Sequence, residues 1–232
     1  MATINLVTII GLALVNAINP CALAALAMVL LSILLANENK RHKILLGGFY
    51  FALAVFIGYF IYGVIIIKLF QSFADFASVV TPYIRIILAI FAIGIGMFNI
   101  KDYINYKPGG FATEMPLIFR PRVNQIIKGI SSPKGAFVAG IFVTLFLLPC
   151  TMGPYLVATG NLSSLEFLKT IPYLLLYNLI FILPMLIITV IVYYGIPPEK
   201  VGEWRDRKIK YIHLIAGILL IALGIAMITG LI

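Results

Sequence analysis

Residues 135–160 read GAFVAGIFVTLFLLPCTMGPYLVATG, a stretch that contains no charged side chain. It is longer than the roughly 20 apolar residues that an α-helix needs to cross a bilayer. The rest of the chain has the same character: 62% of the 232 residues are hydrophobic, 11% are charged, and the mean hydropathy is +1.11. Soluble domains carry about 25% charged residues, so the composition predicts an integral membrane protein.

The hydropathy pattern predicts an all-α fold of six transmembrane helices. They are expected at residues 4–36, 44–67, 83–100, 135–160, 167–195 and 211–232. The first segment lacks a basic leading region and is longer than the apolar part of a signal peptide, so we interpret it as a retained helix. A short amphipathic helix is also expected near residues 123–130.

The sequence predicts two halves of three helices each. Pro20-Cys21 matches Pro149-Cys150 at an offset of 129 residues, and Gly96 matches Gly224 at an offset of 128. Because three is an odd number, the second half must enter the membrane upside down relative to the first. We therefore divide the chain into an inverted repeat at residues 1–100 and 135–232, joined by a connector at residues 101–134. Such repeats place a site near the bilayer midplane, where the two halves meet.

The basic residues predict the orientation. Only three of the 17, namely Lys68, Arg85 and Lys169, fall in or beside the loops on one side of the predicted topology. The other 14 fall on the opposite side. Basic loops stay in the cytoplasm, so we expect a multi-pass protein of the cell membrane with both termini outside and the three basic loops inside. The net charge of +9 is explained by topology and anionic headgroups, and it requires no nucleic-acid partner.

Two cysteines are the candidate site residues. Cys21 and Cys150 lie well inside their predicted helices, and each directly follows a proline. A cysteine in a membrane helix is usually a small buried apolar residue. Here the equivalent positions of the two cysteines and the adjacent helix breakers favour thiol chemistry. The residues expected to break the helices and shape the site are Asn19, Pro20, Pro149, Thr151, Gly153 and Pro154.

The attacking species in thiol–disulfide exchange is the thiolate. A helix break favours this form because it gives the cysteine a local helix N-terminus and access to water. A proline inside a helix removes one backbone hydrogen bond, and the freed carbonyl must find a partner in protein or in a water-lined cavity. Two interrupted helices at corresponding positions are also typical of transporter sites. A disulfide further requires the two Cα atoms to lie within about 7 Å of each other.

At these residues the sequence resembles a known family. Asn19-Pro20-Cys21-Ala22-Leu23 and Leu148-Pro149-Cys150-Thr151-Met152-Gly153-Pro154-Tyr155 are similar to the two cysteine motifs of CcdA, a small relative of the transmembrane domain of DsbD. The resemblance covers essentially the whole chain. Other family members often carry further prolines after the first cysteine, whereas residues 22–35 contain none, so we expect the first helix to be less broken than the fourth.

The resemblance implies a function. A disulfide between Cys21 and Cys150 would accept electrons from cytoplasmic thioredoxin and pass them to thioredoxin-like proteins outside, in support of cytochrome c maturation. Exchange of this kind proceeds through mixed disulfides and needs no cofactor.

Two other functions remain as alternatives. The first is a small-solute or ion permease built on the same broken helices, in which the cysteines are incidental. The second is a quinone-linked disulfide oxidase, which ranks last because it would need a second cysteine pair. No metal site is expected, because the only histidines, His42 and His213, are placed at cytoplasmic helix ends without carboxylates nearby.

The remaining polar, aromatic and glycine residues support packing roles. Asn16 and Asn178 would line a cavity or form interhelical hydrogen bonds. Tyrosines including Tyr59 and Tyr62 are typical of interfacial belts. Close helix packing is expected at Gly94, Gly96, Gly217 and Gly224.

Overall fold

The fold is all-helical. The structure, a computed structural model, describes residues 6–37, 41–75, 81–105, 118, 120–128 and 130–229. Its helices are α1 (Leu6–Ala17), α2 (Pro20–Ala36), α3 (Arg41–Asp75), α4 (Thr81–Ile104), α5 (Arg120–Lys128), α6 (Pro133–Leu162), α7 (Phe167–Tyr193) and α8 (Pro198–Ile228). Residues 106–117 of the predicted connector lie outside the described part of the chain.

These helices contain four to six candidate membrane spans. α3, α4, α7 and α8 each contain a span that is long and apolar enough to cross a bilayer. Two further spans are bent: α1 and α2 meet at 48°, and the two parts of α6 meet at 86°. Counting each bent pair as one span gives the six crossings that the hydropathy pattern predicts. The bend is larger in α6, but the helical backbone is interrupted between α1 and α2 and continuous in α6, so the first helix is less bent but not less broken than the fourth.

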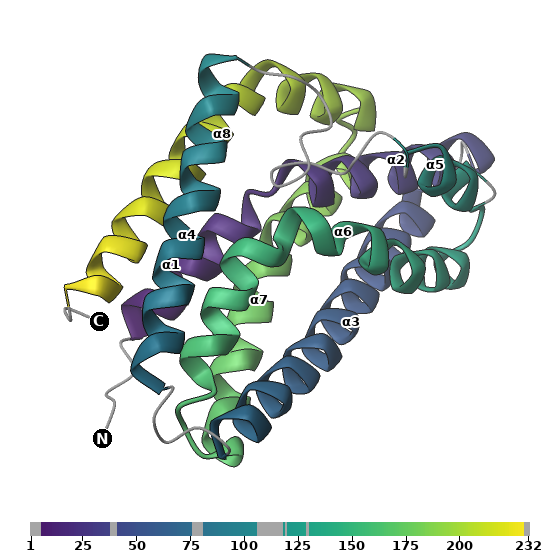
Figure 1. The fold of residues 1–232 in the computed structure, drawn as a ribbon. Coiled ribbons are helices and arrows are strands. Elements are labelled where there is room, and N and C mark those ends of the chain that lie inside the picture. The colour runs from purple at the N-terminus through teal and green to yellow at the C-terminus, as the bar shows by residue number, and fades with distance from the viewer. Residues whose placement is uncertain are drawn as a thin grey trace.

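The helix ends sort into two groups (Figure 1). The beginning of α1, the end of α3, the turn between α6 and α7, and the end of α8 lie at one end of the bundle. The end of α4 and the beginning of α8 lie at the other end. This grouping matches the sides that a six-span topology assigns to these segments. Which group faces the cytoplasm stays a prediction from the basic residues, and the inverted relation between the two halves stays a prediction as well.

α8 begins 13 residues earlier than the sequence analysis places it. The residues that were assigned to a basic loop, from Lys200 to Lys210, form its first three turns instead. Pro198 stands at a helix start, where its missing N–H costs nothing, and Lys, Glu and Arg are good helix formers. The turn before it closes at Gly195, whose φ of +114° is a backbone conformation that favours glycine.

The predicted amphipathic segment is confirmed as α5. Val123 and Ile127 are buried, whereas Arg122 and Gln125 are exposed, so one face of the helix packs on the bundle. α5 contacts α2 and α6, and this places it beside the broken first span and the bent fourth span.

Glycines bring α4 and α8 into close contact. A Cβ atom at Gly217 would lie 2.8 Å from the carbonyl oxygen of Gly96, and one at Gly224 would lie 2.9 Å from the carbonyl oxygen of Ala89. The packing roles expected for these glycines are therefore confirmed. The expectation for Gly94 is wrong, because a Cβ atom there would meet no atom within 4 Å.

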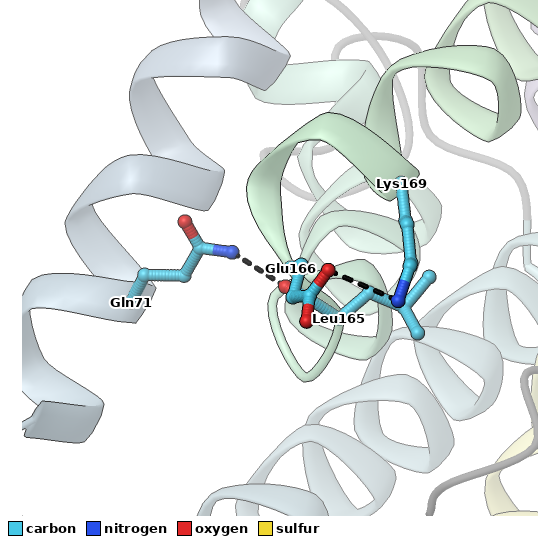
Figure 2. Close-up of polar contacts among 4 residues, drawn as sticks. All are labelled: Gln71, Leu165, Glu166 and Lys169. Carbon is cyan, nitrogen blue, oxygen red and sulfur yellow. Dashed lines mark hydrogen bonds and ion pairs between the residues drawn. The ribbon is translucent and has the colours of Figure 1, made fainter.

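A polar side chain fastens the end of α3 to the turn between α6 and α7 (Figure 2). The Nε2 atom of Gln71 donates a hydrogen bond of 2.8 Å to the carbonyl oxygen of Leu165. Nearby, Lys169 and Glu166 form an ion pair of 3.0 Å, but both side chains are largely exposed. The Gln71 contact joins segments 94 residues apart in the sequence and holds them at the same end of the bundle.

Candidate functional site

The break between α1 and α2 is built by Asn19. The backbone at Asn19 is extended, and its Oδ1 atom accepts a hydrogen bond of 2.9 Å from the backbone N–H of Cys21. Pro20 occupies the first position of α2, where it interrupts no helical hydrogen bond. Cys21 therefore lies in the first turn of a new helix and is 6% exposed. An amide cap of this kind stabilises a helix start by about 1 kcal/mol.

The break in α6 has a different form. Helical structure continues from Leu148 to Thr151, but the axis turns by 86° at Pro149 and Cys150. A proline inside a helix cannot donate its backbone hydrogen bond, and its ring crowds the preceding turn. The interrupted ladder explains the bend without any loss of helical backbone around the cysteine.

Thr151 anchors the bend to α3. Its Oγ1 atom lies 2.7 Å from the hydroxyl of Tyr59 and 3.0 Å from the carbonyl oxygen of Leu147, so the side chain is buried and hydrogen-bonded. This is the residue that follows Cys150 in the sequence. The position of the bend is thus coupled to a helix from the other half of the chain.

Gly153 and Pro154 lie in the first turn after the bend and are both buried. A Cβ atom at Gly153 would lie 2.7 Å from Cδ1 of Ile95, so the absence of a side chain allows α4 to approach. Asn19, Thr151, Gly153 and Pro154 thus lie at or next to the two breaks, and their role in shaping a site stays a prediction.

Both helices of the first broken span contact the bent fourth span. α1 and α2, the second of which carries Cys21 in its first turn, both contact α6, which carries Cys150. The side chains of Pro20, Pro149 and Cys150 lie outside the described part of the structure. The pairing of Cys150 with Cys21 is therefore a proposal.

A cluster of three buried tyrosines lies next to the α6 bend. The sequence analysis did not predict it. Tyr59, Tyr155 and Tyr177 are at most 1% exposed. Tyr155 packs edge-on against both other rings, with ring centroids 5.4 Å apart in each case. The Tyr155 hydroxyl donates a hydrogen bond to the carbonyl oxygen of Tyr59. The expectation of an interfacial belt is therefore wrong for Tyr59, whose hydroxyl is satisfied by Thr151 inside the bundle.

Two buried asparagines adjoin the tyrosine cluster. Asn16 in α1 and Asn178 in α7 are both 0% exposed. Neither the Oδ1 nor the Nδ2 atom of Asn16 has a hydrogen-bond partner, and the Oδ1 atom of Asn178 also has none. The side chain of Asn16 lies beside Tyr177, and that of Asn178 lies beside Tyr155. The bundle interior is therefore more polar than the sequence indicates.

His213 is buried rather than placed at a helix end. Because α8 begins at Pro198, His213 lies well inside that helix, 1% exposed, with its Nδ1 atom 3.0 Å from Oδ1 of Asn99. Within the described residues, no three His, Cys, Asp or Glu side chains gather closely enough to hold a metal ion. That the protein needs no metal or cofactor stays a prediction.

The comparison with protein families decides the classification. The model of the cytochrome c biogenesis protein transmembrane region matches residues 7–226, nearly the whole chain. The chain belongs to this family. Searches among curated proteins and among solved structures give no match.

Membership of the cytochrome c biogenesis transmembrane family confirms the DsbD-like resemblance of the cysteine motifs. It agrees with the four straight and two bent spans, and the protein is a multi-pass membrane protein. The match includes both helix breaks, so the two cysteine motifs and the buried tyrosines all lie inside the family region.

Proposed function

We propose that this protein carries reducing equivalents across the membrane by thiol–disulfide exchange at Cys21 and Cys150. One observation supports the proposal above the others: Cys21 lies in the first turn of α2, at a capped break in an otherwise apolar span. A helix start favours negative charge through its unpaired N–H groups and dipole, and the thiolate is the form that attacks a disulfide. The second cysteine lies at the α6 bend, on a helix that contacts α1 and α2.

The exchange proceeds in two balanced steps. A thiolate of reduced thioredoxin attacks one sulfur of the Cys21–Cys150 disulfide, so that a mixed disulfide forms and the other cysteine leaves as a thiolate. The second thiol of thioredoxin then attacks the mixed disulfide. This step releases oxidised thioredoxin and leaves the membrane pair as a dithiol. Two electrons and two protons have then entered the pair, and the reverse sequence with an oxidised acceptor outside releases them.

Net outward flow needs no nucleotide or ion gradient. Thioredoxin has a reduction potential of about −270 mV, and each 30 mV of difference to the acceptor corresponds to about 1.4 kcal/mol for two electrons. A more oxidising thioredoxin-like protein outside therefore draws electrons from the cytoplasm. The proposed partners are cytoplasmic thioredoxin on the basic side and such an acceptor on the side of the termini.

The number of free thiols tests this proposal. The protein is reconstituted in lipid, alkylated and weighed before and after the addition of reduced thioredoxin. We expect an increase from no free thiol to two. A thioredoxin that lacks its second cysteine attacks the oxidised wild-type pair and stops at the mixed disulfide, and peptide mapping of that adduct identifies which of Cys21 and Cys150 is attacked first. Two thiols that no oxidant can pair would contradict the proposal.

A permease remains the second candidate because of the buried asparagines. Asn16 and Asn178 give the bundle interior unpaired polar atoms of the kind that line a transport path. The double variant Cys21→Ser/Cys150→Ser separates the two functions in whole cells. Loss of cytochrome c maturation in this variant supports the carrier, whereas normal maturation supports a protein whose cysteines are incidental.

A further inference from the structure

The unpaired polar atoms of Asn16 and Asn178 are the least explained feature of the bundle interior. A buried polar group without a hydrogen bond costs about 1–3 kcal/mol, and the cost is higher where no solvent can reach. Three such atoms, two on Asn16 and one on Asn178, adjoin the buried tyrosine cluster. Native proteins satisfy groups of this kind with ordered internal water, which typically makes two to four hydrogen bonds.

The neighbouring hydroxyls supply the remaining partners for water. The Tyr177 hydroxyl is 3.5 Å from the carbonyl oxygen of Leu12, at the outer limit of a hydrogen bond, so it can bind a further partner. Asn178 already uses its Nδ2 atom, which donates a hydrogen bond of 2.9 Å to the carbonyl oxygen of Leu174. Its Oδ1 atom is left without a hydrogen-bond partner. Polar side chains of α1, α6 and α7 thus lie next to one another in the bundle interior.

Hydrogen bonds to backbone carbonyls link residues of this polar cluster to the residues at both helix breaks. On one side, the backbone N–H of Asn19 donates a hydrogen bond of 3.1 Å to the carbonyl oxygen of Asn16, and Asn19 in turn caps Cys21. On the other side, Tyr155 bonds to the backbone of Tyr59, whose hydroxyl bonds to Thr151, the neighbour of Cys150.

We propose that Asn16, Asn178, Tyr155 and Tyr177 hold internal water that delivers protons to the two cysteines. The proton role rests on the proposed function, whereas the water site does not. When the disulfide is reduced, each sulfur leaves as a thiolate, and a charge buried without a partner is strongly disfavoured. Each thiolate must take up one proton, and hydrogen-bonded water can pass that proton from the aqueous side. Oxidation of the pair by the acceptor returns both protons along the same path.

Radiolytic hydroxyl-radical labelling followed by mass spectrometry tests for the water itself. Radicals form where water is present, so a buried side chain is labelled only if water lies beside it. We expect Tyr155 and Tyr177 to be labelled several-fold more than Phe51, an equally buried aromatic residue of α3. Labelling of both tyrosines at the level of Phe51 would overturn the water site.

Two independent variants test the proton role. Asn16→Leu and Asn178→Leu remove polar atoms from different helices, and the exposed Asn105→Leu is the matched control. Monodisperse size-exclusion profiles identify the variants that fold. In these, we expect weaker tyrosine labelling, slower reduction of the cysteine pair by reduced thioredoxin, and a changed solvent deuterium isotope effect on that rate. An unchanged rate and isotope effect in both variants overturns the proton role. A wild-type protein that never exchanges with thioredoxin contradicts the proposed function instead, and the labelling result still decides the water site.

Discussion

The hydroxyl of Tyr59 lies 2.7 Å from the Oγ1 atom of Thr151, although the two residues are 92 positions apart. This contact joins α3 of the first half to the bend of α6 in the second half. Because Thr151 follows Cys150 directly, the contact fixes the backbone beside the second cysteine. The orientation of the α6 break is therefore set by tertiary packing as well as by proline.

Replacement of Tyr59 tests this coupling. We expect Tyr59→Phe to lower the free energy of unfolding by about 1 kcal/mol, the typical net value of one hydrogen bond. The rate of exchange at Cys150 should change as well, because the bend loses one of its anchors. Thermal unfolding in detergent and alkylation kinetics measure the two effects. Tyr194→Phe removes a hydroxyl from a side chain that is 79% exposed and should change neither quantity; equal effects of both variants would contradict the coupling.

Removal of the helix cap at Asn19 tests the first break. Asn19→Ala deletes the acceptor for the Cys21 backbone N–H, and we expect a loss of about 1 kcal/mol in stability. The reactivity of Cys21 toward a small alkylating agent should change in the same variant. Asn19→Ser keeps a capping oxygen and should restore most of both properties. If serine and alanine behave alike, the cap does not hold the break.

A methyl group at Gly63 tests the packing around Tyr155. A Cβ atom at Gly63 would overlap the buried Tyr155 hydroxyl. Overpacking of this kind costs about 1–3 kcal/mol, so we expect Gly63→Ala to be destabilising. Gly94→Ala is the matched control, since a Cβ atom there meets nothing within 4 Å. Because alanine is a better helix former than glycine, this control should be neutral or slightly stabilising, and a destabilised control would remove the steric interpretation.

The contact of Gln71 with the turn between α6 and α7 is expected to matter more than the ion pair beside it (Figure 2). Gln71→Leu removes hydrogen bonds to two backbone carbonyls, those of Leu165 and Ser163. Glu166→Gln breaks an ion pair whose side chains are 65% and 76% exposed, and surface pairs of this kind contribute little. Proteolysis of the turn, followed by mass spectrometry, should detect opening in the first variant alone.

Site-directed labelling tests the predicted orientation. In a Cys21→Ser/Cys150→Ser background, Lys208→Cys and Lys169→Cys place single thiols in two exposed positions at α8 and at the beginning of α7. The distribution of basic residues predicts that an impermeant maleimide reaches position 208 from the cytoplasm and position 169 from outside. The reverse pattern would invert the topology, and with it the direction in which electrons leave.

The sequence was sufficient for the six spans and for both break positions, because hydropathy and proline act locally. The extended α8 shows where this approach fails. The stretch from Lys200 to Lys210 is too polar for a membrane segment, so hydropathy alone places the beginning of the last helix at Tyr211. In the structure the helix begins earlier, at Pro198, because the polar residues from Lys200 to Lys210 are good helix formers and proline is favoured at a helix start.

Only the tertiary structure decided which polar side chains meet inside the bundle. Tyr59 and Tyr155 are as compatible with a membrane interface as with a protein core, because each has an apolar ring and a single polar atom. His213 meets Asn99 across 114 positions, and such a pair depends on the rotation and register of two whole helices. The hydropathy of the sequence does not determine the rotation or the register of one helix against another. The sequence thus determined where the helices break, and packing between distant helices determined which polar groups surround the breaks.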